Sequence, residues 1–207
     1  MIFNHSAPAE LTEIATKGLA IGTGNFHTQE VEVSTSYDTE WTNLYNSNGW
    51  IAIDPAVKLG MSCLGTHEWA LDPRTNDFAK TAHDFGLSQG IAISSNIGGN
   101  RCIVGMCLDS PPSASTISAA KHATQRHHLA HLTAKARSLS QQQKDLVFLF
   151  SMGLRSKEVA AEFGISEDAV KQRKLTILKH IGANNFLVAV NVCSRLDCED
   201  HLLSSKI

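Results

Sequence analysis

The chain has 207 residues, of which 43% are hydrophobic and 18% are charged, proportions that are normal for a soluble protein with buried cores. No run approaches the roughly eighteen apolar residues of a membrane-spanning helix, and the N-terminus lacks the pattern of a secretory signal, so we expect a cytoplasmic protein. The net charge of −2 hides an asymmetry, because residues 1–136 carry eight basic and twelve acidic side chains, against ten and eight in residues 137–207. We therefore expect any phosphate-binding element in the second part.

The chain begins with a helical pattern followed by two strand patterns. Apolar residues at helical spacing predict a short helix over residues 7–17. Residues 19–24 and 30–36 are predicted as strands, and in the second strand valines alternate with glutamates, as in a half-buried strand.

Three further helices in this part are marked by their starts and ends. Asp38 is a candidate N-cap. The pair Asp54 and Pro55 is a second start signal, with proline in the first turn, and Gly86 follows a third helical pattern. Helices are accordingly expected over residues 37–50, 51–60 and 75–85.

Two apolar segments, 90–94 and 101–108, flank Gly98 and Gly99 and predict a hairpin. One long helix follows over residues 113–137. Helices around a mixed sheet indicate an α+β domain arranged as an α/β/α sandwich. We assign this domain to residues 1–136, and residues 137–207, which show no strand pattern, to a second, all-α domain of four helices.

The second part shows helix boundaries at close intervals. An apolar stripe predicts a helix that ends at Gly153. Ser156 is a candidate cap for a second helix over residues 157–163, and Ser166 is a candidate cap for a third. A short helix, a tight turn and a second helix are the general pattern of a helix-turn-helix.

The third helix has two unlike faces. Val170, Ile177 and Ile181 fall on one side at 100° per residue. The opposite side is long, polar and free of acids beyond its first turn, and could enter a major groove. By itself this pattern also fits a solvated helix of a small bundle. The opposite side carries Lys171, Gln172, Leu175 and Lys179.

The sequence LSQQQKDLVFLFSMGLRSKEVAAEFGISEDAVKQRKLTILKHIGANNFLVAV, residues 139–190, resembles the LuxR-type helix-turn-helix over all four helices and without a gap. The resemblance implies a dimer that binds double-stranded DNA. It places Lys171, Gln172 and Leu175 where family members read bases. Matching positions include Leu139, Gly153, Glu158, Val159, Ile165, Ser166, Val170, Ile177, Gly182 and Ala189. Phosphate contacts are expected from Arg173, Lys174 and Lys179.

The first part carries a sparser motif of aromatic and acidic residues, Y-x3-W-x3-Y-x8-D-P-x13-W. Its members are Tyr37, Trp41, Tyr45, Asp54, Pro55 and Trp69. On physical grounds the aromatic residues are either core packing or the walls of a pocket for a small amphipathic ligand, because buried Tyr, Trp and Asp need polar partners.

This spacing resembles the autoinducer-binding domain of LuxR-type quorum-sensing receptors. The resemblance implies that Tyr37, Trp41 and Asp54 hydrogen-bond the polar head of an N-acyl homoserine lactone. It implies that Tyr45 and Trp69 line the pocket. Cys107 falls near a position that often holds a hydroxyl, and because a thiol is a poorer hydrogen-bonding group, a different ligand or a different mode of binding stays open.

The leading hypothesis is a dimeric transcription regulator controlled by a small autoinducer. The alternative is a LuxR-like protein that needs no ligand and acts through another regulator protein or a heterodimer. No nucleophile and base pattern supports an enzyme. His127 and His131 lie one helical turn apart, but no nearby Cys or acid completes a metal site, so we expect neither a metal nor a cofactor.

Overall fold

The computed structural model describes residues 2–4, 7–26, 28 and 30–204. The chain forms two compact units, one of Met1–Asn96 and Arg101–His128, the other of Ile97–Asn100 and Leu129–Ile207. The expected domain boundary at residue 136 stays a prediction, because α5 (Ala114–Arg137) contributes to both units.

The first unit is built around a six-stranded sheet with the order β1-β3-β2-β6-β5-β4. β1 runs parallel to β3, whereas the β2–β3, β2–β6 and β4–β5 pairs are antiparallel, so the sheet is mixed as expected. The strands are β1 (Ile2–Asn4), β2 (Gly18–Asn25), β3 (Glu30–Thr35), β4 (Gly65–Ala70), β5 (Gln89–Ile97) and β6 (Asn100–Cys107).

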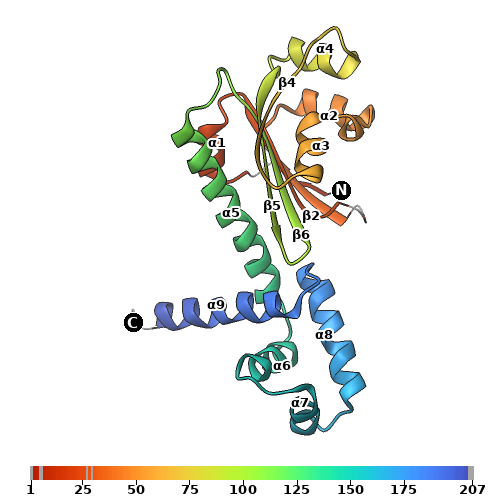
Figure 1. Ribbon diagram of the computed structural model, residues 1–207, viewed down its shortest axis with the longest axis vertical. Coiled ribbons are helices and arrows are strands. Elements are labelled where there is room, and N and C mark those ends of the chain that lie inside the picture. The colour runs from red at the N-terminus through yellow and green to blue at the C-terminus, as the bar shows by residue number, and fades with distance from the viewer. Residues whose placement is uncertain (1, 5–6, 27, 29, 205–207) are drawn as a thin grey trace. The chain divides into compact units, whose positions relative to one another are not determined.

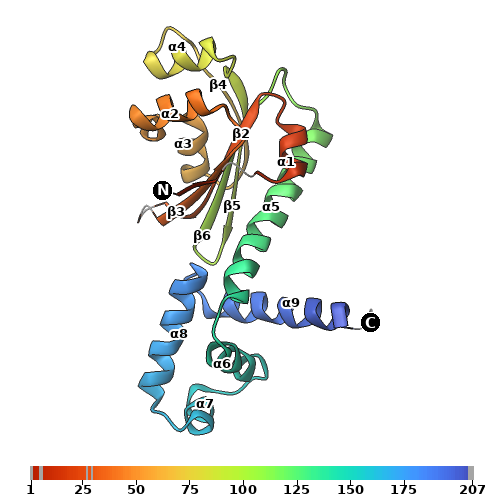
Figure 2. The same cartoon turned by 180° about the vertical axis from the view of Figure 1, so that it is seen from behind.

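Helices cover both faces of this sheet (Figures 1 and 2). Helix α1 (Ala9–Ile14) and the first part of α5 lie against one face, where Leu11, Leu19 and Met106 belong to one buried core. The opposite face is covered by α2, α3 and α4, with a second core around Trp41 and Phe78. The three-layer α/β/α arrangement is therefore confirmed. These helices are α2 (Thr39–Ser47), the 3-10 helix η1 (Trp50–Ala52), α3 (Pro55–Ser62) and α4 (Asp77–Asp84).

Local signals determine where these helices begin. The side chain of Asp38 accepts a hydrogen bond from the N–H of Glu40 at 2.7 Å and caps α2, and Asp54 caps α3 ahead of Pro55. Both starts were expected. Two strands were not expected: β1 is only three residues long, and β4 lies at the edge of the sheet, where its half-exposed residues show no apolar alternation.

The second unit contains helices packed around one core, in which Leu146, Val159, Val170, Ile177 and Ile181 have no exposed surface. Beyond α5 its helices are α6 (Gln141–Ser151), α7 (Ser156–Phe163), α8 (Glu167–Ile181) and α9 (Phe186–Ser204). The expectation of helices without strands over residues 137–204 is met.

Of the two helix N-caps that the sequence predicts in this unit, one is confirmed and the other is not. Ser166 caps α8 by accepting from the N–H of Ala169 at 3.2 Å. The expectation that Ser156 caps α7 is wrong, because Ser156 is the first helical residue and Arg155 occupies the N-cap. The carboxylate of Glu158 reaches back to the N–H of Arg155 at 2.6 Å, and this contact moves the helix start by one residue.

Candidate functional site

A cavity of about 110 Å³ lies in the first unit, between the sheet and the layer formed by α2, α3 and α4. Its polar wall contains all six residues predicted from the aromatic motif and β6: Tyr37, Trp41, Tyr45, Asp54, Trp69 and Cys107. Trp41 and Tyr45 lie on α2, and Tyr37 lies two residues before it. Asp54 is the N-cap of α3, Trp69 lies on β4 and Cys107 lies on β6. The tertiary structure thus brings together residues that span seventy positions of sequence.

The register of three adjacent strands builds the floor of this cavity. On β2, Ala20 pairs with Thr35 of β3 and with Gly105 of β6, and Gly22 pairs with Val33 and Ile103. All six of these residues line the cavity. Because side chains alternate along a strand, Leu19 and Ile21 point to the α1 and α5 core instead. β2 therefore presents small residues to the cavity and large ones to the opposite face.

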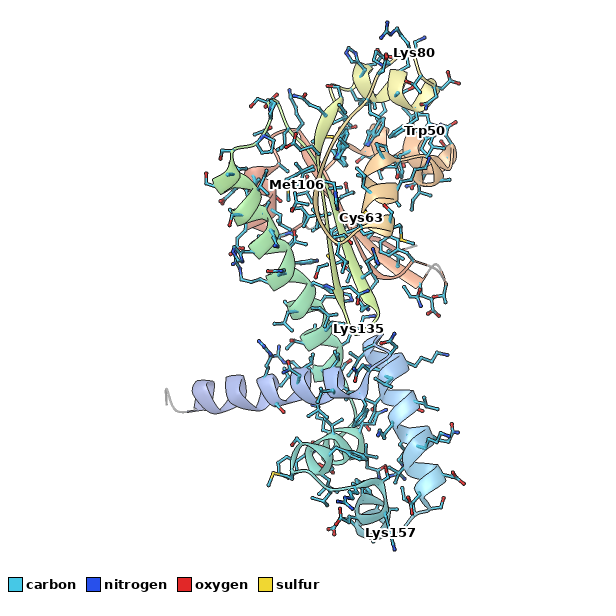
Figure 3. The ribbon with its side chains drawn as sticks, in the orientation of Figure 1. Trp50, Cys63, Lys80, Met106, Lys135 and Lys157 are labelled. Atoms are coloured by element: carbon cyan, nitrogen blue, oxygen red, sulfur yellow. The ribbon has the colours of Figure 1, made fainter. Side chains whose placement is uncertain are left out.

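The same alternation divides β6. Met106, labelled in Figure 3, packs in the core shared with α1 and α5, whereas its neighbour Cys107 belongs to the cavity side. The hydroxyl of Tyr37 donates to the Sγ atom of Cys107 at 3.2 Å. The thiol thus has a partner within the protein in the absence of any ligand.

Asp54 has a partner on each oxygen. Its Oδ1 accepts from the N–H of Ala56 at 2.7 Å, which is the cap of α3, and its Oδ2 accepts from the hydroxyl of Tyr45 at 2.8 Å. Tyr45 is thus more than a wall residue, because it connects α2 to the carboxylate. A ligand N–H that reaches Asp54 must share an oxygen with one of these donors or displace it.

Burial changes the pKa values of the titratable groups that line the cavity. It raises the pKa of the Asp54 carboxyl, against the opposing effect of the hydrogen bonds from Tyr45, Ala56 and Val57. Burial also raises the pKa of the Cys107 thiol to about 12, and the pKa of both Tyr37 and Tyr45 lies well above the ordinary tyrosine value. The hydroxyls and the thiol are therefore neutral near pH 7.

Trp41 is the centre of an aromatic cluster. Its ring lies 5.5 Å from Phe85, 5.7 Å from Trp50 and 6.0 Å from Phe78 and from Tyr45 between centroids. Such tilted contacts stabilise rings beyond the area that they bury. The cavity thus combines a floor of small residues, an aromatic wall and a few polar groups, which suits an uncharged amphipathic molecule.

Sequence reasoning missed the apolar part of this site. The missed residues lie on the sheet and on α4, among them Ala20, Gly22, Val33, Ile103, Gly105 and Phe78. A signal for the floor was present in β2, where Gly18, Ala20 and Gly22 recur at every second position. Such a repeat of small residues on one face of a strand leaves space above the sheet.

In the second unit, the predicted base-reading residues lie on one surface of α8. Lys171, Gln172, Leu175 and Lys179 are exposed, and half of Leu175 is accessible to solvent. Arg173 and Lys174 are different, because both are half-buried against aromatic rings. Arg173 lies over Phe163 at 5.4 Å, and Lys174 lies over Phe150 at 4.5 Å and over Phe186 at 4.6 Å.

No group of three His, Cys, Asp or Glu side chains that could hold a metal occurs among the residues that the structure describes. His128, next to His127 on α5, is fully buried and its Nδ1 lies 3.0 Å from the hydroxyl of Ser95. Within the same residues no helix is long and apolar enough to cross a membrane.

Residues 17–136 match the family model of the autoinducer binding domain. This match covers more than half of the chain, so the chain belongs to the autoinducer binding domain family. The autoinducer-binding domain expected in the first part is therefore confirmed, and so is the expectation that the chain is not an enzyme. The family match ends before α6, and the helix-turn-helix stays a prediction.

The solved structures that resemble the chain include SdiA of Escherichia coli, which is 18% identical over 89% of this chain and 85% of that chain, with a TM-score of 0.46. SdiA in complex with octanoyl-rac-glycerol is 18% identical over 89% of this chain and 86% of that chain, with a TM-score of 0.47. CepR2 of Burkholderia cenocepacia, an N-acylhomoserine lactone dependent LuxR family transcription factor, is 19% identical over 58% and 81%, with a TM-score of 0.44. No curated protein matches the chain.

We predict that Tyr45→Phe lowers the free energy of unfolding by about 1.5–3 kcal/mol, the usual contribution of a hydrogen bond to a charged group. The measurement is urea unfolding of Tyr45→Phe, Asp54→Ala and the double variant. Because the hydroxyl and the carboxylate act as a pair, the two effects should not add. Additive losses would show that the hydrogen bond contributes nothing.

A second prediction concerns pH. Because the folded-state pKa of Asp54 is raised, the folded chain binds this proton more tightly than the unfolded chain does. The stability of the wild type relative to Asp54→Asn should therefore rise as the pH falls through the raised pKa, and level off below about 3.9, the pKa of an unperturbed Asp. Thermal unfolding of both proteins across this range tests the sign, and a difference that falls on acidification would contradict it.

Proposed function

We propose that the chain is a LuxR-type transcription regulator whose first unit binds an autoinducer, an N-acyl homoserine lactone or a similar small molecule, and whose second unit binds double-stranded DNA. The observation that carries the proposal is the cavity itself. In a domain of the autoinducer-binding family, all six residues expected to contact the ligand line one cavity. A regulator of this kind acts in the cytoplasm, where the chromosome is.

The chemistry of the cavity supports this ligand class. A lactone head offers carbonyl oxygens and one amide N–H. The cavity offers the Asp54 carboxylate as an acceptor and the neutral hydroxyl of Tyr37 as a donor, once that hydroxyl turns from Cys107 to the ligand. The acyl chain is apolar, as is the floor around Gly22 and Ile103. Trp41 and Trp69 supply flat walls, and each carries an indole N–H that can donate to a carbonyl.

The arrangement of α7 and α8 supports the DNA-binding part. Three residues separate the two helices, and Gly164 among them has a positive φ of 63°, which closes a tight turn. Val170, Ile177 and Ile181 anchor α8 in the core, so the opposite surface projects away from the helical core of its own unit. This surface carries Lys171, Gln172 and Leu175, which the proposal assigns to base edges in a major groove.

The cation–aromatic contacts distinguish among the three residues that this proposal expects to bind phosphates. Lys179 is exposed and free to reach a phosphate, whereas Arg173 and Lys174 also stabilise the domain through the rings of Phe163, Phe150 and Phe186. A homodimer that binds a two-fold symmetric site completes the proposal, because helix-turn-helix proteins commonly bind such sites in pairs.

One observation favours the alternative function, a regulator that needs no ligand. Asp54 and Cys107 already have partners within the protein, and the cavity of about 110 Å³ is small beside the range of about 300–1,000 Å³ that is usual for ligand pockets. Such a protein would act through a complex with another regulator. It would co-purify with that partner, and no lactone would change its stability.

The ligand proposal predicts that at least one N-acyl homoserine lactone raises the midpoint of thermal unfolding, because a ligand of the folded state stabilises it. Asp54→Ala should abolish the shift. Asp38→Ala is the matched control, since Asp38 caps α2 as Asp54 caps α3 but does not line the cavity. Absence of a shift across a panel of lactones would contradict the ligand proposal and favour the alternative.

The DNA proposal predicts that Lys171→Ala and Gln172→Ala each lose about 1–3 kcal/mol of preference for the selected site over random DNA. The site is first selected from random duplexes with the wild-type protein, and binding is followed by fluorescence anisotropy at several salt concentrations. Lys80→Ala, on the exposed surface of α4 (Figure 3), is the control that removes a lysine from the other unit. Wild-type specificity in both α8 variants would show that this surface does not read bases.

A further inference from the structure

One end of the cavity floor is covered by a side chain from a loop. Phe26 follows the last residue of β2 and lines the cavity together with Gly22. A Cβ atom added to Gly22 would lie 2.8 Å from Cζ and 3.3 Å from Cε1 of Phe26, so the tip of the ring occupies the space above this glycine. Without a glycine at position 22, the ring could not lie there.

The two ends of the cavity differ in chemistry. At one end of the β2–β6 pair, Gly18 pairs with Cys107, and a Cβ at Gly18 would lie 2.5 Å from Cδ1 of Tyr37. This is the polar end, where the Tyr37 hydroxyl meets the thiol. Four residues further along β2, Gly22 pairs with Ile103. Cys107 and Ile103 are four residues apart, which corresponds to roughly 13 Å at the usual rise of a strand.

Phe26 lies at the apolar end, over Gly22, which pairs with Val33 and Ile103. Val31 also lies over Gly22, since its Cγ1 is 3.3 Å from the same added Cβ. Because Phe26 stands in a loop and not in a strand, its side chain can be shortened without breaking a pair of the sheet. The ring therefore takes up space over Gly22, at the side of the cavity away from Cys107.

We propose that Phe26 determines ligand length in this protein: its ring ends the cavity about four residues along the sheet from Cys107 and selects short acyl chains over long ones. The inference rests on the proposed function, since it assumes an acylated ligand with its polar head near Tyr37 and Asp54. The small volume of about 110 Å³ agrees with a short chain.

The test measures dissociation constants of the full chain for butanoyl, hexanoyl, octanoyl and dodecanoyl homoserine lactone by calorimetric titration. The wild type should bind the short members more tightly than the dodecanoyl one. Phe26→Ala should improve dodecanoyl binding relative to hexanoyl binding by about tenfold or more, since added methylenes then find an apolar space. Phe148→Ala, which removes an exposed ring from α6, should keep the wild-type profile.

Gly22→Ala provides a second variant. Its Cβ must push the Phe26 ring further into the cavity, so it should weaken the binding of every lactone in the wild type. In the Phe26→Ala background the same substitution no longer meets the ring, keeps the contact with Val31 at 3.3 Å and should weaken binding much less. This coupling would not arise if the two residues acted separately.

The outcomes separate this inference from the proposed function. If lactones bind but Phe26→Ala keeps the wild-type profile, or if the wild type prefers dodecanoyl, the role of Phe26 is wrong and the ligand proposal stands. Binding gained only in Phe26→Ala would support the blocking role. If no lactone binds either protein, the ligand proposal fails and the inference fails with it.

Discussion

A carboxyl group that is largely shielded from water must accept hydrogen bonds from the protein. In this protein the carboxyl group of Asp54 accepts them from residues of two helices, α2 and α3. One oxygen accepts the N–H of Ala56 and starts α3, and the other accepts the hydroxyl of Tyr45 on α2. Loss of either donor would leave this half-buried carboxyl group short of a partner. The carboxylate thus holds together the helical layer above the cavity, and the same group is the acceptor that the proposed ligand would use.

The other constraint comes from the sheet below. β2 places Leu19 and Ile21 in the core with α1 and α5, and Ala20 and Gly22 under the α2–α4 layer. Large residues on both faces would fill the space and leave only a packed core, as in most sheets covered by helices on both sides. The cavity therefore exists because one strand lacks side-chain volume on one face. Its size is then set by the rings that reach over that face, including Phe26.

In the second unit, some cations of α8 pack on aromatic rings, and others are exposed on the surface that the proposed function uses. Lys174 lies over two rings from α6 and α9, so it joins three helices by electrostatic attraction to aromatic faces. Lys171, Gln172 and Lys179 carry no such packing and remain exposed. Helix α8 thus uses its half-buried cations to hold the domain together, and its exposed cations form the surface that the proposed function assigns to DNA.

Much of the architecture was predictable from local patterns. The caps at Asp38, Asp54 and Ser166, the glycine turn at residues 98–99 and the two periodicities of strand and helix depend on neighbours within a few positions, and these expectations agree with the structure. The edge strand β4 was missed because its apolar alternation is weak. The start of α7 was predicted one residue too late, with Ser156 as the cap, because the contact between Glu158 and the N–H of Arg155 has no distinctive signal in the sequence. Five of the six polar-wall residues were predictable as a motif, and Cys107 only through the resemblance to a family. The tertiary structure decided which partners these residues meet. Strand register and the packing of α2 over the sheet determine three contacts: the hydrogen bond from Tyr37 to Cys107, the one from Tyr45 to Asp54, and the approach of Phe26 to Gly22. Distances between segments far apart in the chain are set by the whole fold, and no local pattern encodes them.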